Sequence, residues 1–456
     1  MKMTTKYNKT HNYLFVKGSA ALKRYLPVLL ALTTATSALA QTKTITLQEA
    51  IKLGQDNSKL LKLSQVKVDE AVSQYNQAKD RVLPTGSASF TYDRAEIPAH
   101  TLSFGPSTIG LPTGANAWLG IASVNEIIYQ GHKLKYAQES TNMLTEVARL
   151  DIAKNRDEIT YDIIKAYYDL YKVLQSKKVI DSNLKSIDEQ IHQSQRFFDQ
   201  GLVTKNDVLR FQLQRSNVEL NGIDLENNRK VVNYNLDVML GLPETTELNI
   251  ATVNEATPAL APLMTYLDSA YANRQELVQL DIRGKVAETN IKDIDANTAP
   301  TISGSVGGYY VNIGDSPWPK SGTYITPITV GATISWKFDA LWTNKNKLSQ
   351  ARIQKDEVTI NKNIQIDNIK YDVNQSYQSY VTAVNKIKLL QTAIDQAGEN
   401  NKILISKYKA STASATDKAD AETLLFQAEI SLELAKADAG LAYYTLLKST
   451  GKLNKQ

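Results

Sequence analysis

The side chains that could support catalysis or bind a metal are few and scattered along the chain. The four histidines share no metal-ligand spacing and stand at positions 11, 100, 132 and 192. No glycine-rich loop with a lysine could cradle a phosphate, because the run Gly304–Gly308 lies inside a strand pattern. Most aspartates and glutamates fit solvated helix faces. We therefore expect no catalytic, cofactor-binding or metal site, and we do not expect an enzyme.

Composition narrows the class of protein further. Of 456 residues, 42% are hydrophobic and the mean hydropathy is −0.31, which excludes both a helical membrane protein and a disordered chain. The net charge of +5 is the small difference between 52 basic and 47 acidic groups, so a nucleic-acid partner is not indicated. The chain has no cysteine, which excludes disulfides and a lipid-modified cysteine.

Residues 1–40 have the pattern of a signal peptide. Lys17, Lys23 and Arg24 supply positive charge, and a short apolar stretch runs from Leu26 to Ala35. Small residues at 38–40 allow cleavage before position 41. The alternative is a buried first helix, but the charged start favours export. After this segment no apolar run approaches the roughly 18–20 residues of a spanning helix, so any membrane crossing must use strands.

The rest of the chain resembles itself. Seven residues of the first half recur 216 positions later: Leu47, Asn57, Leu61, Ala71, Pro84, Ser87 and Ser89 match Leu263, Asn273, Leu277, Ala287, Pro300, Ser303 and Ser305. Further on the offset becomes 210, so that Asp207 and Gly241 match Asp417 and Gly451. We predict two repeats, residues 41–251 and 252–456, each ordered helix, strand, strand, long helix, helix.

Four stretches alternate apolar and polar residues with period two. The clearest runs from Pro327 to Phe338, and the others lie at 87–93, 118–129 and 302–310. Strands of about ten residues with one apolar face suit a membrane barrel with a wet lumen. A half-buried soluble sheet has the same alternation and stays open as an alternative. The segments linking each pair, roughly 95–116 and 312–323, are expected to be surface loops.

Two very long helices are the other distinctive feature. Residues 132–198 contain neither proline nor glycine, which predicts a helix of roughly 65 residues and about 100 Å. From Ile159 to Phe198, apolar residues recur at spacings of four and three, interrupted by Lys177 and Ser194, and a second such seam runs from Ile366 to Leu404. The fold class is therefore mainly α with a small β part, built as a lengthwise coiled-coil bundle.

Four strands per chain cannot close a barrel, and an open sheet edge in lipid leaves backbone groups unpaired. Three chains would supply twelve strands, within the size range of membrane barrels, together with a ring of long helices. We therefore expect a homotrimer in which a twelve-stranded transmembrane β-barrel continues into a helical tube.

At this point the sequence resembles the TolC family of outer-membrane efflux proteins. The resemblance rests on the opening-helix segment 46–57, on the strand-to-helix turns at 129–131 and 338–339, and on the hairpin-tip segment 201–209. With the repeat and helix lengths it spans most of residues 44–451. It implies an outer-membrane channel with a periplasmic helical extension, which serves a tripartite efflux or type I secretion system. The partners implied are outer-membrane lipid, a periplasmic adaptor and an inner-membrane transporter.

The family resemblance also implies where gating residues lie. Its acidic pair near the second hairpin tip falls on Asp417 and Asp420, which would ring the periplasmic constriction with six carboxylates in a trimer. The alternative is that both only complement a helix N-terminus. Ser411 and Ala413 depart from the glycine and basic residue common in the family. The residues expected to contact the adaptor are Gly201, Leu202, Val203, Thr204, Ser411 and Ser414.

A second function stays open at this stage. An exported coiled-coil scaffold or adhesin would also have a signal peptide and heptad seams, but it would not need matched strand pairs in both halves. The exported cargo, the pump and the resting state of the tip are not encoded in any motif that we recognise.

Overall fold

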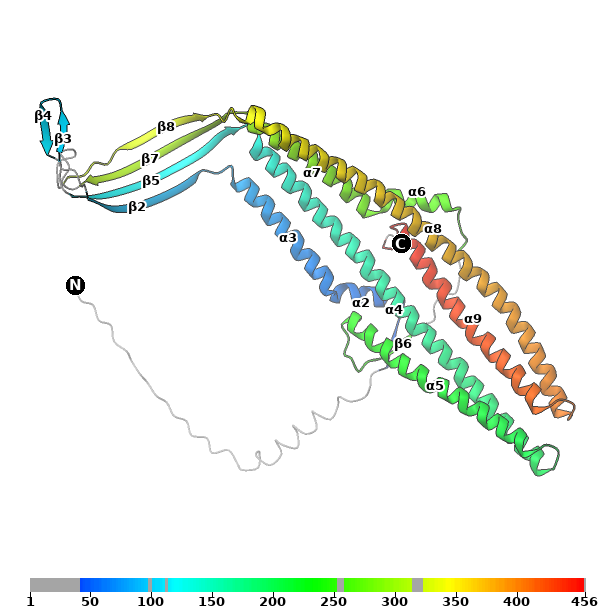
Figure 1. The fold of residues 1–456 in the computed structure, drawn as a ribbon. Helices are drawn as coiled ribbons and strands as arrows, with labels where there is room; N and C mark the ends of the chain where they lie inside the picture. The colour runs from blue at the N-terminus through cyan, green and yellow to red at the C-terminus, as the bar shows by residue number, and fades with distance from the viewer. Residues whose placement is uncertain (1–41, 97–100, 111–113, 252–257, 314–322, 455–456) are drawn as a thin grey trace, which may run out of the picture.

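The computed structural model describes residues 42–96, 101–110, 114–251, 258–313 and 323–454. The predicted signal peptide, residues 1–40, lies outside this part of the chain. The molecule is elongated, with a sheet at one end and long helices running away from it (Figure 1). None of the helices in the described ranges combines the length and the hydropathy that a membrane span requires.

The two halves hold their main elements in the same order. The first half consists of β1 (Thr42–Ile45), α2 (Leu47–Asn57), α3 (Lys59–Asp80), β2 (Thr85–Glu96), β3 (Thr101–Phe104), β4 (Ser107–Gly110), β5 (Gly114–Gln130), α4 (Lys133–Asp199), α5 (Lys205–Leu240) and β6 (Glu247–Ile250). The second consists of α6 (Leu263–Asn273), α7 (Gln275–Asp295), the short 3-10 helix η1 (Ala296–Thr298), β7 (Thr301–Ile313), β8 (Ile328–Ser335), α8 (Ala340–Lys409) and α9 (Ala415–Ser449). The division into repeats at residue 251 stays a prediction.

Each opening helix is broken into two, which the sequence did not lead us to expect. The first break falls at Ser58, whose Oγ accepts a hydrogen bond from the Leu61 N–H at 3.2 Å and so caps α3. The second falls at Arg274, between α6 and α7. The segment expected as a surface loop also contains the antiparallel hairpin β3–β4. The two helix breaks and the hairpin depend on local turns, which do not change the spacing of the apolar residues in the sequence.

The two long helices form the axis of the molecule. Helix α4 has 67 residues and α8 has 70. Both are continuous because neither contains proline; α4 also lacks glycine, and α8 continues through its single glycine, Gly398. Helix α4 packs on α3, α5, α7 and α9, whereas α8 packs on α7 and α9. The seam predicted on α4 is largely buried, from Ile163 to Ser194. Lys177 is the exception, because its side chain is exposed and pairs with Asp181 at 3.6 Å.

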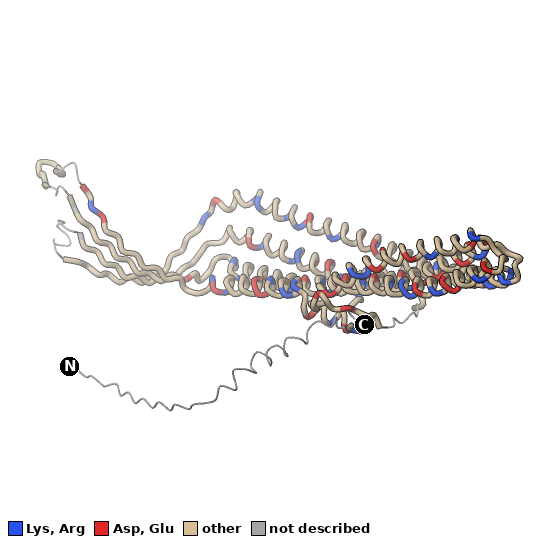
Figure 2. Tube along the Cα trace, turned by 90° about the horizontal axis from the view of Figure 1, so that it is seen from below, with Lys and Arg blue, Asp and Glu red and all other residues tan. Residues whose placement is uncertain are grey.

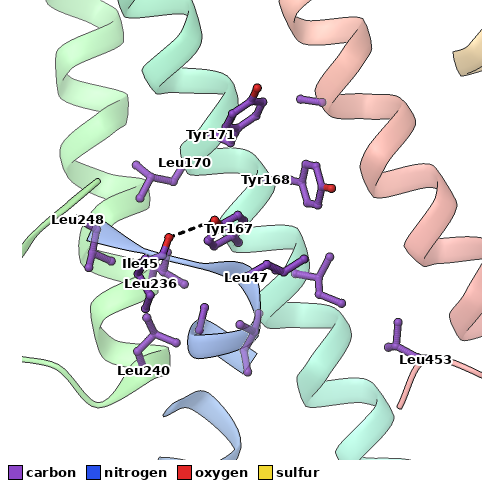
Figure 3. Packing of buried hydrophobic residues seen from close by; sticks show 14 of the residues in the cluster. Ile45, Leu47, Tyr167, Tyr168, Leu170, Tyr171, Leu236, Leu240, Leu248 and Leu453 are labelled. Atoms are coloured by element: carbon purple, nitrogen blue, oxygen red, sulfur yellow. Dashed lines mark hydrogen bonds between the residues drawn. The ribbon is translucent and has the colours of Figure 1, made fainter. Parts of the chain in front are cut away.

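A compact core ties the bundle together at its middle. Strands β1 and β6 pair in parallel there, and they bring Ile45 and Leu248 onto Leu170 of α4 and Leu236 of α5 (Figure 3). The hydroxyl of buried Tyr167 donates a hydrogen bond to the Ile45 carbonyl at 3.2 Å. The N-terminal strand therefore fastens the α4–α5 hairpin far from both ends of the molecule.

The sheet joins the helices through a turn that requires glycine. Gly131 follows β5 with φ of 60°, and a Cβ there would lie 2.7 Å from the Ala296 carbonyl oxygen. That contact is too short for any side chain, so the turn needs both the conformational freedom and the small size of glycine. The turn sets the direction in which α4 leaves the sheet.

Candidate functional site, an amphipathic sheet and two hairpin tips

The larger sheet separates apolar from polar side chains. It is antiparallel, with strand order β2-β5-β7-β8. The register aligns one set of apolar residues across all four strands, which we call the apolar face: Ala88, Phe90, Tyr92, Trp118, Ala122, Val124, Ile302, Val306, Tyr310, Ile328, Val330 and Ile334. Ring pairs cross between strands on this face, such as Tyr92–Trp118 at 5.3 Å. The alternation predicted in single strands is thus combined into one continuous surface.

The opposite surface, which we call the polar face, carries mostly small hydroxylic residues. Its members are Ser87, Ser89, Thr91, Ser123, Asn125, Ser303, Ser305, Thr329 and Thr333. Ser87 and Ser123 lie 3.2 Å apart across the β2–β5 pair. The pattern has exceptions, since Leu119, Ile121 and Ile127 of β5 and Val311 of β7 fall on the polar face and Glu126 falls on the apolar face; nothing in the structure explains the apolar exceptions.

Neither face of this sheet is covered by the helices, which begin where the strands end (Figure 1). Ile328 and Val330 are each 79% exposed. Charged residues are frequent along the helices and sparse along the strands (Figure 2). Contiguous exposed apolar surface of this kind marks a membrane or protein interface.

Both edges of the sheet are open. Within the described ranges β2 pairs only with β5, and β8 only with β7, so their outer backbone groups face away from the sheet. All residues of β2 and β8 are exposed. An unpaired edge is a template for another strand, and in lipid it cannot persist without one.

Aromatic side chains gather where the sheet meets the helices. Trp336, Phe338 and Trp342 form a chain of ring contacts at 6.3 and 6.0 Å, and all three are more than half exposed. The indole N–H of Trp336 donates to the Thr298 carbonyl at 2.9 Å. Exposed rings with an anchored polar atom are typical of the interface between a membrane and water.

The first hairpin tip joins α4 to α5 at the far end of the molecule. Gly201 adopts φ of 70°, and the N–H of Leu202 donates to the Phe197 carbonyl at 2.8 Å, which closes the turn. The N–H and hydroxyl of Thr204 both donate to Oδ2 of Asp207 at 2.8 Å. Three of the four predicted adaptor-contact residues here, Gly201, Leu202 and Thr204, are exposed, and Val203 is half-buried.

The second tip joins α8 to α9 with a similar turn. Ser411 takes the left-handed conformation with φ of 59°, and the N–H of Thr412 donates to the Lys407 carbonyl at 2.9 Å. Ser414 donates from its N–H and Oγ to Oδ2 of Asp417 at 3.1 and 2.7 Å, and the Asp417 N–H returns a bond to Ser414 Oγ. These bonds from Ser414 lower the pKa of Asp417.

The structure brings Asp417 and Asp420 onto one exposed face of α9, as their spacing predicts. Asp417 also has the capping role that was the alternative interpretation. Asp420 pairs with Arg210 of the first hairpin at 3.4 Å. Their lining of a constriction, and the adaptor contacts of the tips, stay predictions. Across the described residues, no three metal-ligating side chains gather into a possible metal site.

Sequence reasoning missed two residues beside this acidic pair. Lys418 and Glu422 are buried at the second tip, although charged residues in the helices were expected to be solvated. The available signal was a lysine and a glutamate one turn apart in an alanine-rich stretch, residues 413–421, whose small side chains let neighbouring helices approach closely.

Comparison with known proteins finds a matching family, a relative in sequence and several solved structures with this fold. Residues 50–242 and 266–452 match the family described as outer membrane efflux protein. The chain is 23% identical over 385 residues to the outer membrane efflux protein BepC of Brucella suis biovar 1 (strain 1330), covering 82% of this chain and 78% of BepC.

Solved structures share the fold. The outer membrane protein VceC of Vibrio cholerae matches with a TM-score of 0.71 at 15% identity, over 89% of this chain and 96% of that one. The CmeC outer membrane channel of Campylobacter jejuni matches with a TM-score of 0.72 at 14% identity, over 89% and 86%.

Proposed function

The chain belongs to the outer membrane efflux protein family and is a component of an outer-membrane efflux channel, and we propose that three copies of it form one passive duct. In this proposal the apolar face of the sheet contacts outer-membrane lipid and the polar face lines water. The observation that carries the proposal is the in-register apolar face on a sheet with two open edges. Such a sheet is stable in lipid only if its edges close on other copies.

The two open edges lie on opposite sides of the sheet, which favours a ring of several copies. Strand β2 ends the sheet on one side and β8 on the other. Pairing β2 of one copy with β8 of the next would join three sheets into twelve strands without a free edge. A contact between two different edges of identical chains closes into a ring when the rotation between copies permits.

The helices carry a second set of unpartnered surfaces. Helix α5 exposes seven apolar residues at heptad-like spacing: Leu209, Leu213, Leu220, Ile223, Val231, Tyr234 and Val238. On the opposite flank, the half of α8 nearer the tip, which lies level with α5, exposes Leu389 and Ile403 (Figure 1). Seams of this kind are buried in coiled coils. Packing α5 of one copy against α8 of the next would cover both and would extend the duct as a helical tube.

The tube would extend through the periplasm and end at the two hairpin tips. We place the docking surface for a periplasmic adaptor on the exposed tip residues Gly201, Leu202, Thr204, Ser411 and Ser414 with half-buried Val203, and the adaptor would couple the duct to an inner-membrane transporter. Asp417 and Asp420 of three copies would form a cation-binding ring at the end of the duct. Transport then depends on gating and needs no catalytic residue. The scaffold or adhesin alternative would leave the whole apolar face in water, and we do not propose it.

A reconstitution experiment tests the duct and its acidic ring together. The mature protein is purified in detergent, its oligomeric mass is measured, and conductance is recorded in a planar bilayer. We expect a trimer with small cation-favouring steps, which enlarge and lose selectivity in D417A/D420A because the ring of carboxylates is removed.

The control D69A/E70A removes two exposed acidic residues of α3, far from the tips, and should leave conductance unchanged. A trimer whose steps are the same in D417A/D420A would retain the duct and contradict the acidic ring. A monomer without conductance would contradict the duct itself.

A further inference from the structure

Two charged side chains are buried one helical turn apart at the second tip. Lys418 and Glu422 on α9 are each 3% exposed. Removing either charge from water is costly unless partners replace its hydration. Nothing in the channel proposal uses these residues, so their partners indicate what their burial accomplishes.

Glu422 is held by the long helix of the first half. The Ser186 hydroxyl donates to its Oε1 at 2.5 Å, and the side-chain amide of Gln190 donates to its Oε2. Both donors lie on α4, one turn apart. Burial raises the pKa of Glu422, and the charge of Glu429 adds to this effect, whereas the Ser186 bond and Lys418 oppose it. The carboxylate therefore fits one position along α4, and neither a shift nor a rotation of α9 would keep both bonds.

Lys418 contacts the other two helices of the tip. Its Nζ lies 5.5 Å from the ring centre of Phe211 on α5 and 4.9 Å from that of Tyr408 on α8. Burial lowers the pKa of Lys418 to about 8. Through these two side chains α9 has directional contacts with α4, α5 and α8.

The rest of this face of α9 is small and apolar. Ala415 and Ala419 pack against Phe211 and Tyr408, and Ala421 is buried as well. Alanine contacts have little directional preference, so they would tolerate a rotated helix. At 100° per residue, Lys418 and Glu422 lie on the side opposite to Asp417 and Asp420, which are exposed.

We propose that Lys418 and Glu422 are positioning residues that fix the rotation of α9 on its three neighbours and so hold Asp417 and Asp420 on its outward face. This inference rests on the proposed function for the role of the acidic pair, whereas the fixed rotation is a property of the tip alone. Buried polar groups that specify register at some cost in stability are well attested between packed helices.

A thiol placed on the buried face measures the rotation. The chain has no cysteine, so Ala419→Cys introduces a single thiol at a position that is 5% exposed. We expect maleimide labelling of the assembled protein to be slow in this parent and about tenfold faster when E422A is added, because E422A removes both acceptors for the α4 donors Ser186 and Gln190 and so frees α9 to rotate or open. E422Q keeps the length and an acceptor for Ser186, so its labelling should stay near the parent rate.

The matched control is E429A, one heptad further on the same face of α9 and half-buried. It should label at the parent rate or more slowly, because it removes a like charge that acts on Glu422 and leaves the bonds from α4 in place. If E422A fails to assemble, Q190L removes a donor from α4 without changing α9 and should also speed labelling. Parent-rate labelling in both E422A and Q190L would overturn the proposal, as would E422Q labelling as fast as E422A.

Conductance separates positioning from general stability. E422A should reduce cation selectivity as much as D417A/D420A does, whereas E422Q and E429A should retain it. Retained selectivity in E422A with fast labelling would contradict the link to Asp417 and Asp420. If the unmodified protein gives no conductance at all, the duct proposal fails, and the labelling rates still decide whether α9 is held in rotation.

Discussion

The two hairpin tips have the same turn but differ in what they bury. Each begins its second helix with a hydroxyl residue that bonds an aspartate three positions on, Thr204 with Asp207 and Ser414 with Asp417. At the offset of 210, buried Val208 corresponds to buried Lys418. Exposed Gln212 corresponds to Glu422, which is buried against α4.

The difference predicts that the first tip keeps one arrangement, whereas the second tip can change between discrete arrangements. Val208 packs without directional preference, and its contacts survive small rotations. Lys418 and Glu422 require particular partners, and each charge stabilises the other, so losing one leaves the other buried without a nearby opposite charge. A tip held by few directional contacts can change between discrete arrangements, as gating requires. The first tip has no such contacts at the equivalent positions.

The largest expected effect comes from giving the first tip the charge of the second. In V208K an ammonium replaces an apolar group that is 4% exposed, with no carboxylate provided for it. We expect the first tip to open locally at a cost of about 3–5 kcal/mol in stability. Amide hydrogen exchange over residues 205–215 measures this as lost protection.

The double variant V208K/Q212E provides the missing carboxylate one turn along and serves as the control. It should recover part of the lost protection, because Glu at 212 can approach the new ammonium while remaining partly in water. Unchanged protection in V208K would show that the first tip accepts a buried charge as readily as the second. The contrast between the tips would then be lost.

A smaller effect follows from the depressed pKa of Lys418. Its ordinary value is 10.5 and its value in the closed tip is about 8, because of burial, with Lys409 lowering it further and Glu422 opposing. Between these pH values Lys418 binds a proton in the locally unfolded tip but not in the folded tip. The free energy of opening the second tip should therefore rise with pH from about 8 to 10.5, by at most about 3 kcal/mol.

Exchange protection over residues 405–425, corrected for intrinsic rates, measures this slope. The slope is read below about pH 9.5, where Tyr408 stays protonated in both the folded and the opened tip, because its ordinary pKa is 10.0 and burial raises it in the folded tip. K418M retains the apolar stem without the charge and should show no slope, and the first tip should show none in the same protein. An equal slope at both tips would assign it to a group other than Lys418.

Much of the fold could be predicted because its signals are local. The seams of α4 and α8 and the alternation of β7 and β8 are periodic in the sequence itself. The β1–β6 pair could not be predicted, since Ile45 and Leu248 meet only after α4 and α5 have folded between them. The break at Ser58 depends on a cap that many serines could provide, and the break at Arg274 has no side-chain cap at all, so neither position could be distinguished in the sequence.

The candidate site divides in the same way. Asp417 and Asp420 were found through the resemblance and their spacing, and the open edges of the sheet through the strand count. Lys418 and Glu422 were missed because a charged residue on a helix is solvated in most cases. Their burial depends on Ser186, Gln190 and Phe211, more than 200 residues earlier in the chain.

The smallest effect concerns the residue at the centre of each turn. Gly201 and Ser411 both have positive φ, 70° and 59°, a conformation that costs a residue with a Cβ about 1–2 kcal/mol. A Cβ on Gly201 would meet nothing within 4 Å, so G201A should weaken the first tip by this conformational cost alone. S411G should strengthen the second tip by up to about 1 kcal/mol, because the relief of strain exceeds the entropy that glycine adds to the opened chain. Exchange protection at the two tips should thus change in opposite directions. If S411G weakens its tip instead, the Ser411 turn stores no strain. The conformation of the second tip would then be set by Lys418 and Glu422 without any contribution from its turn.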